Sequence, residues 1–346
     1  MLPLAGAGWL ACALGTWARP SAWFLVAGLA LAVLILVLAR NARATWLGAV
    51  VPALLVATTM VGAVALGTTT RDQAALVALE GKSSEATVRL TSTFMPGDKS
   101  VTGAVVGLGG EPLARGPVPV RVIGDLGDTR RALGSDVVLR AQLMRSNPWD
   151  HDSWLLFVEP GPALWEEPGR FLVGADGLRQ EFSERSSTLG GDGGRLLPGL
   201  AIGDTSAVDP GLTAAMQATS LSHLVAVSGA NCAVVVAIVV AIVALCGGGV
   251  WPRMIAGVSA LVGFVALVTP EPSIIRAAIM ASIVLIFLAA SKPVRGIPVL
   301  GTTVLLLLAW NPWLSTDFAF ALSVFATGGI LLLVTCLLYT SPSPRD

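Results

Sequence analysis

Eight apolar runs, interrupted by one polar insert between residues 69 and 215, constrain this chain more than any other feature. The runs are 2–17, 21–39, 46–66, 221–245, 254–268, 273–290, 297–310 and 318–338. A helix needs about 20 apolar residues to cross the hydrocarbon core of a bilayer. Only 13% of the residues are charged, whereas soluble domains carry about 25%. We therefore predict an α-helical polytopic membrane protein with about eight transmembrane helices. The first three of these helices lie within 1–68.

Basic residues in the short loops predict the orientation of these helices, because Lys and Arg collect in cytoplasmic loops. The loops after the second, fourth and sixth runs carry Arg40, Arg43, Arg253, Lys292 and Arg295. These loops lie on one side if every run crosses the membrane, and we assign that side to the cytoplasm. The polar insert is then expected to be extracytoplasmic.

The first part of the insert, 69–163, predicts an all-β domain. Short apolar alternations recur between Gly, Pro and Asp residues, as expected for strands. The five predicted strands are 85–95, 102–108, 117–123, 135–145 and 153–159. Five short strands favour a small Greek-key barrel such as an OB-fold.

The second part of the insert, 164–219, predicts an amphipathic helix and a linker. Apolar residues recur at helical spacing among charged ones at Phe171, Leu172, Leu178, Phe182 and Leu189. Such a helix suits the surface of a membrane. The Gly-rich stretch 190–194 predicts a flexible joint after it.

A polar cluster, SLSHLVAVSGANC over 220–232, opens into the fourth apolar run. Polar side chains at the mouth of a lipid-length helix cost free energy unless they have partners or a function. The candidate functional residues of this cluster are Ser220, Ser222, His223, Ser228, Gly229 and Asn231. Arg276 and Asp317 in later runs are candidates for the same reason.

Three further segments accompany the cluster: LAIGDTS at 200–206, PSIIRAAIM at 272–280, and Asn311-Pro312 followed by DFAFALSVFATGG at 317–329. In this order, the four segments resemble the motifs of the ComEC family of competence proteins. The resemblance implies an inner (plasma) membrane channel for single-stranded DNA, with an OB-like domain after the first helices. Residues 220–338 would then be the transmembrane channel domain, which is truncated.

The resemblance also implies partners, namely single-stranded DNA, membrane lipid, a receptor that delivers DNA, and cytoplasmic DNA-handling motor or binding proteins. The sequence contains no Gly-x-x-x-x-Gly-Lys-Ser/Thr loop for a nucleotide, so we expect a partner or a gradient to drive transport. It leaves open whether the pore forms within one chain or in a homo-oligomer.

Each candidate residue of the DNA path has an alternative structural role. His223 with its neighbouring serines is typical of a helix cap at the interface, and Ser228-Gly229 of a close helix contact. Arg276 would attract phosphate in the functional role. In the alternative role, its side chain would extend (snorkel) to the membrane surface. Asp317 would begin a helix.

Two departures from the family limit what the resemblance implies. Many members have His at the position of Asn231, so a role that needs an imidazole there is unsupported. Long members continue into a metallo-β-lactamase-like domain, whereas this sequence ends at Asp346 and has only His151 and His223 as histidines. We therefore expect no metal, no other cofactor and no nuclease activity, and we interpret 339–346 as a non-native tail.

A DNA-binding role for the β domain rests on aromatic residues rather than on charge. Residues 84–158 contain eight basic and eight acidic residues, and a strong phosphate binder would show a basic excess. Phe94, Trp149, Trp154 and Phe157 are candidates for stacking on bases, as in OB-folds. The alternative is that they fill the barrel core or its rim.

Two other functional classes are weighed against a channel. Ala226-Val227-Ser228-Gly229 is similar to the Gly-x-Ser-Gly nucleophile of rhomboid proteases, but His223 would lie about 140° around a helix from Ser228, too far to act as its base. We therefore predict no enzyme. A small-molecule permease or membrane assembly component with an outer recognition domain is the alternative function.

Overall fold

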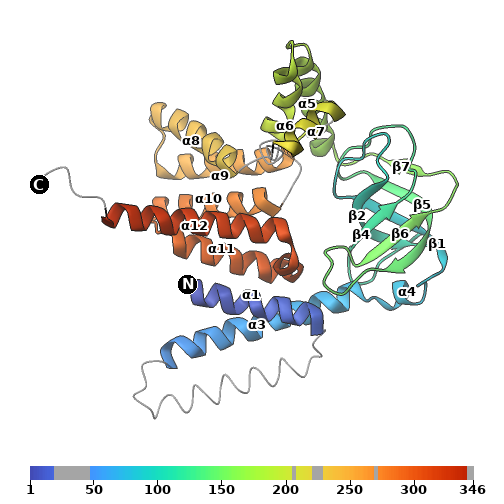
Figure 1. Ribbon diagram of the computed structural model, residues 1–346, viewed down its shortest axis with the longest axis horizontal. Helices are drawn as coiled ribbons and strands as arrows, with labels where there is room; N and C mark the ends of the chain where they lie inside the picture. The colour runs from blue at the N-terminus through green and yellow to red at the C-terminus, as the bar shows by residue number, and fades with distance from the viewer. Residues whose placement is uncertain (19–46, 205–207, 220–228, 269–271, 341–346) are drawn as a thin grey trace, which may run out of the picture. The chain divides into compact units, whose positions relative to one another are not determined.

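The computed structural model describes residues 1–18, 47–204, 208–219, 229–268 and 272–340, and Figure 1 labels its elements. The chain divides into two compact units. The first comprises Met1–Asp72, Asn147–His151 and Ala290–Asp346, and the second comprises Gln73–Ser146 and Asp152–Ala289. The first unit thus contains apolar helices from both ends of the chain, and the second contains the predicted β domain.

The first unit is built from apolar helices that aromatic residues join. Its elements are α1 (Leu2–Ala18), α3 (Leu47–Arg71), α11 (Gly296–Trp310), the 3-10 helix η2 (Pro312–Thr316) and α12 (Phe318–Thr340). The Trp9 ring stacks on Phe320 with 5.2 Å between centroids, and Trp9 Nε1 donates to the Ser315 carbonyl at 2.8 Å. Helix α3 approaches η2 so closely that a Cβ at Gly67 would lie 2.5 Å from the Trp313 ring.

A loop of the β domain, Asn147–His151, belongs to this helical unit. Three successive carbonyls of the loop accept hydrogen bonds from Trp313 Nε1 at 2.9 Å, Thr316 Oγ1 at 2.8 Å and Arg71 Nη1 at 3.0 Å. The Arg71 guanidinium also lies 3.4 Å from the centroid of the Trp313 ring, a cation–π geometry. The backbone at Trp149 is therefore held by the helical unit.

The second unit contains a closed barrel of five strands. The strands are β1 (Ser83–Leu90), β2 (Ser100–Leu108), β4 (Val118–Ile123), β5 (Asp136–Arg145) and β6 (Trp154–Val158), with the short helix α4 (Ala74–Val77) before them. The strand order is β1-β2-β4-β6-β5, and β5 pairs again with β1 to close the barrel. The β4–β6 pair is parallel and the other four are antiparallel. Strand β5, the fourth of the five barrel strands along the chain, thus returns beside β1, the first of them. This is the Greek-key order.

Alternating burial along the strands builds the barrel core. In β2 and β5, nearly every second residue is buried, as expected when one face of a strand points inward. Valine, leucine and alanine dominate this core, which also contains Phe94 and Trp154. Two short strands, β3 (Glu111–Pro112) and β7 (Leu164–Glu166), extend the sheet beside β2 and β5. The five predicted strands are confirmed, although the first ends at Leu90 instead of residue 95.

The rest of the second unit is helical. Its helices are α5 (Arg170–Ser187), α6 (Asp192–Ile202), α7 (Pro210–Ala218), α8 (Gly229–Leu245), α9 (Val250–Leu267) and α10 (Pro272–Ala289). The stretch 190–194, where a flexible joint is predicted, lies between α5 and α6, and α6 begins within it. Gly191 has φ +82°, and a Cβ at Gly194 would lie 2.2 Å from the Leu189 carbonyl oxygen. These glycines therefore allow a tight turn between α5 and α6.

Three helical segments in the described part of the chain are long and apolar enough to cross a membrane: Val51–Arg71, Val250–Leu267 and Pro272–Ala289. Shorter apolar helices cover Leu2–Ala18, Asn231–Leu245, Gly296–Trp310 and Phe318–Val334. The predicted run 21–39 lies outside the described residues. The predicted number of about eight crossings and the extracytoplasmic placement of the insert stay predictions.

Candidate functional site

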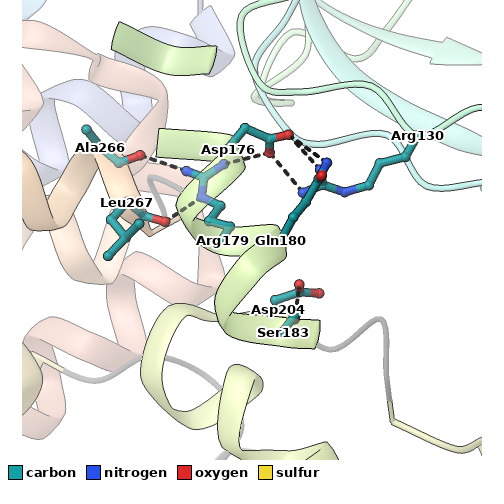
Figure 2. A network of polar contacts seen from close by, with 8 residues as sticks. All are labelled: Arg130, Asp176, Arg179, Gln180, Ser183, Asp204, Ala266 and Leu267. Atoms are coloured by element: carbon teal, nitrogen blue, oxygen red, sulfur yellow. Dashed lines mark hydrogen bonds and ion pairs between the residues drawn. The ribbon is translucent and has the colours of Figure 1, made fainter. Parts of the chain in front are cut away.

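A polar network in the second unit joins the barrel to the helices, and Figure 2 shows it from close by. Arg130 stands in the connection from β4 to β5, and its two Nη atoms donate to the Asp176 carboxylate of α5 at 2.6 and 2.8 Å. This bidentate arrangement is the stronger form of an arginine–carboxylate pair. One turn further along α5, Arg179 lies 3.8 Å from the same carboxylate. Asp176 is thus shared by two arginines.

Arg179 also binds the end of helix α9. Its Nη2 donates to the Ala266 carbonyl at 2.7 Å, and its Nε donates to the Leu267 carbonyl. The last carbonyls of a helix have no partner within the helix, so a basic side chain can satisfy them. Arg179 is only 5% exposed. Burial lowers the pKa of its guanidinium, and the nearby Asp176 carboxylate opposes that shift.

Two further hydrogen bonds extend this network into the segment 200–204. Ser183 Oγ of α5 donates to the Asp204 carboxylate at 2.8 Å. Asn231 Nδ2, in the first turn of α8, donates to the Leu200 carbonyl at 3.0 Å. The amide at Asn231 therefore connects the polar cluster to the segment that precedes it.

Three of the four motif segments meet in one apolar core. Ile202, Cys232 and Ile274 are buried together, each from a different segment. Gly229 allows the closest approach, because a Cβ at this position would lie 2.9 Å from the Cβ of Ala277. The fourth motif segment belongs to the first unit.

Among the candidates for the DNA path, four lie outside the described residues: Ser220, Ser222, His223 and Ser228. Arg276 is 6% exposed, with its Nη1 3.3 Å from the Met280 sulfur. It is therefore buried within the second unit. Asp317 Oδ1 accepts a hydrogen bond from the Phe320 amide at 2.7 Å, which is the geometry of an N-cap on α12.

The four aromatic candidates for base stacking separate into two pairs. Phe94 and Trp154 are 1% and 0% exposed in the barrel core, so their apolar rings fill the interior, as the alternative interpretation expects. Phe157 is 37% exposed on β6, and Trp149 is 44% exposed in the loop Asn147–His151. Only the latter pair presents ring surface for stacking.

Charges of the barrel are largely neutralised by pairing. Arg89 forms a bidentate pair with Asp136 at 2.8 and 2.7 Å, and this hydrogen bonding raises the pKa of Arg89. Arg121 pairs with Asp152 at 2.9 Å. A third such pair joins Arg140 to Glu159 at 3.4 Å. The positive charge that these arginines offer to phosphates is therefore partly cancelled, in agreement with the neutral net charge.

Sequence reasoning missed the polar network around Arg179. A signal was present, because Asp176, Arg179, Ser183 and Ser186 recur at spacings of three and four residues, which places them on one face of a helix. In the described residues, no three His, Cys, Asp or Glu side chains gather where they could hold a metal ion.

Comparison with known families decides where the motif segments belong. The family model described as "Competence protein" matches residues 200–345. This part of the chain carries the domain of the competence protein family. The match begins at the segment that binds Asn231 and includes all four motif segments, so the resemblance to the ComEC family is confirmed. No curated protein and no solved structure matches the chain. Together with its apolar helices, the family match makes this a membrane protein with a role in competence and DNA uptake.

Proposed function

We propose that this protein is a channel that passes single-stranded DNA across the inner membrane during natural competence. The observation that carries the proposal is that three family segments meet in one apolar core, and that two of them are also joined by the hydrogen bond from Asn231 to the Leu200 carbonyl. Polar groups within membrane-spanning segments are retained where they line a path or pair with one another. Arg276, a buried cation on α10 in the same unit, is the residue that would attract phosphates along the path.

The barrel would guide the strand before it enters the channel, on the extracytoplasmic side of the membrane. Its Greek-key order and five strands support an OB-like assignment. Because several of its arginines are paired, we expect Phe157 to contribute by stacking, which tolerates any base. Trp149, in the first unit, is a separate candidate for stacking. A receptor would deliver the DNA from outside, and cytoplasmic proteins would pull it in.

DNA uptake tests the proposal in a competent host that lacks its own channel gene and carries this one instead. Arg276→Ala should reduce uptake at least about tenfold, the effect of losing about 1.4 kcal/mol of interaction. Arg253→Ala is the matched control, because Arg253 is also an arginine of an apolar helix, but its Nε binds the Gly248 carbonyl at 2.9 Å. Membrane levels of each variant are measured in parallel.

The outcomes separate the candidate functions. Loss of uptake with Arg276→Ala alone supports a channel in which this cation acts on DNA. Equal uptake by both variants assigns Arg276 to packing. Failure of well-expressed wild-type protein to restore uptake contradicts the channel and favours a permease or an assembly component.

A further inference from the structure

Helix α5 buries polar residues and exposes apolar ones, with charged residues such as Glu181 and Arg185 exposed beside them. The residues that it buries are Asp176, Arg179 and Ser186. On the other side, Phe171 and Leu178 are 65% and 61% exposed. In a water-soluble protein, such a helix would bury its apolar residues and expose its polar ones.

Most of the exposed apolar residues of α5 form one stripe, whereas Val173, 42% exposed, lies on another side of the helix. Phe171, Leu178 and Phe182 are spaced by seven and four residues, which places them within a narrow sector of the helix. Leu189, directly after the helix, continues the same spacing and is 55% exposed. We call Phe171, Leu178, Phe182 and Leu189 the apolar stripe.

Helix α5 is fixed at the end of α9, a helix that is long and apolar enough to cross a membrane. It packs on α9, and Arg179 binds the last carbonyls of α9. With 18 residues, α9 is about 27 Å long, close to the thickness of about 30 Å of the hydrocarbon core. The end of α9 that Arg179 binds therefore lies near the boundary between acyl chains and headgroups.

We infer that α5 lies in the membrane interface, with the apolar stripe inserted among the lipids of the leaflet in which α9 ends. The apolar outer surface of α9, with Ile255 and Val262 each 60% exposed, faces the same lipid, so the stripe continues an existing lipid-facing surface. The helix carries three basic residues (Arg170, Arg179, Arg185) and three acidic ones (Asp176, Glu181, Glu184). Insertion therefore depends on apolar contact and not on anionic lipid. This inference does not depend on transport of DNA.

Site-directed fluorescence on the full chain in phosphatidylcholine nanodiscs tests this placement. In a background in which the four cysteines (Cys12, Cys232, Cys246, Cys336) are replaced, one cysteine is introduced as Leu178→Cys and, separately, as Glu184→Cys. Glu184 is the matched control, because it is exposed on the same helix outside the apolar stripe. An environment-sensitive label on each is then exposed to aqueous iodide and to lipids that carry a quencher near the headgroup.

At position 178, we expect strong quenching by the lipid-borne group and several-fold weaker quenching by iodide than at position 184. The same pattern is expected when a third of the lipid is anionic. Strong iodide quenching at position 178 would overturn the inference, because the stripe would face water. Protection from both quenchers would overturn it too, because another part of the chain or a second copy would then cover the stripe.

Discussion

The barrel and helix α5 bury opposite kinds of side chain within the same unit. The barrel encloses Trp154 and valine-rich strands and pairs its charges outside. Helix α5 encloses an aspartate, an arginine and a serine and leaves phenylalanine and leucine outside. Apolar groups avoid water in both cases, so the difference indicates different surroundings: water for the barrel, and the membrane interface for α5.

The largest expected effect tests the inside of the barrel. Trp154→Ala removes a fully buried ring and should destabilise the barrel by about 3–5 kcal/mol, because it leaves a large cavity. Phe157→Ala on the same strand is the control and should cost about 1 kcal/mol or less, since its ring is partly in solvent. Thermal unfolding of the purified chain, followed by circular dichroism, measures both. Similar losses would contradict the assignment of inner and outer rings.

The next effect tests the inside of α5. Arg179→Met should destabilise the second unit by about 2–3 kcal/mol, because the last carbonyls of α9 lose their buried donor, whereas Asp176 keeps its bidentate pair with Arg130. Arg185→Met is the control: its pair with Glu181 is exposed and is worth about 1 kcal/mol at most. Protease sensitivity of the segment 164–204 reports on the loss. If Arg185→Met were equally harmful, the contrast between the two faces of α5 would fail.

A smaller effect tests the helix contact in the competence domain. Gly229→Ala places a Cβ against Ala277 and should cost about 1–3 kcal/mol through overpacking. Gly263→Ala in α9 is the control, because a Cβ there meets no atom within 4 Å. It should be neutral or slightly stabilising, since alanine favours a helix. Melting temperatures in detergent compare the two, and a harmless Gly229→Ala would show that α8 and α10 can separate without cost.

The smallest effect tests the outside of the barrel. Arg89→Gln removes an ion pair with Asp136 in which the arginine side chain is 56% exposed, so we expect a loss of about 0.5 kcal/mol. Urea unfolding at low salt and at 1 M salt measures it, and the loss should shrink at high salt because charges are screened. A large, salt-independent loss would mean that this pair behaves like the buried pair on α5.

Much of the barrel could be predicted because its local pattern agrees with its fold. Alternation of apolar and polar residues gave the five strands within a few residues of their bounds. The same pattern could not assign the aromatic rings, since Trp154 and Phe157 differ only in which face of β6 they occupy. Pairing with β4 and β5 decides that face.

The sequence predicted the motif segments of the site, but it did not predict which of their residues contact one another. The four segments were visible in order along the chain, and the family match confirms them. Their convergence depends on Gly229, Asn231 and Ile202 meeting residues 30 or more positions away, and no local pattern encodes such a meeting. Arg130 was missed for the same reason, because a lone arginine does not reveal its partner, whereas Arg179 was missed although its spacing from Asp176 and Ser183 indicates one helix face.

By itself, the sequence determined that this protein has apolar helices, a β domain and the competence motifs, because periodicity, composition and motif order are properties of neighbouring residues. Only the tertiary structure decided which rings are buried, that the Gly-rich stretch forms a tight turn, and that α5 turns its polar face inward. These properties depend on what packs against each face. The carbonyls at the end of α9 and the carboxylate of Asp176 supply the partners that make burial of Arg179 favourable.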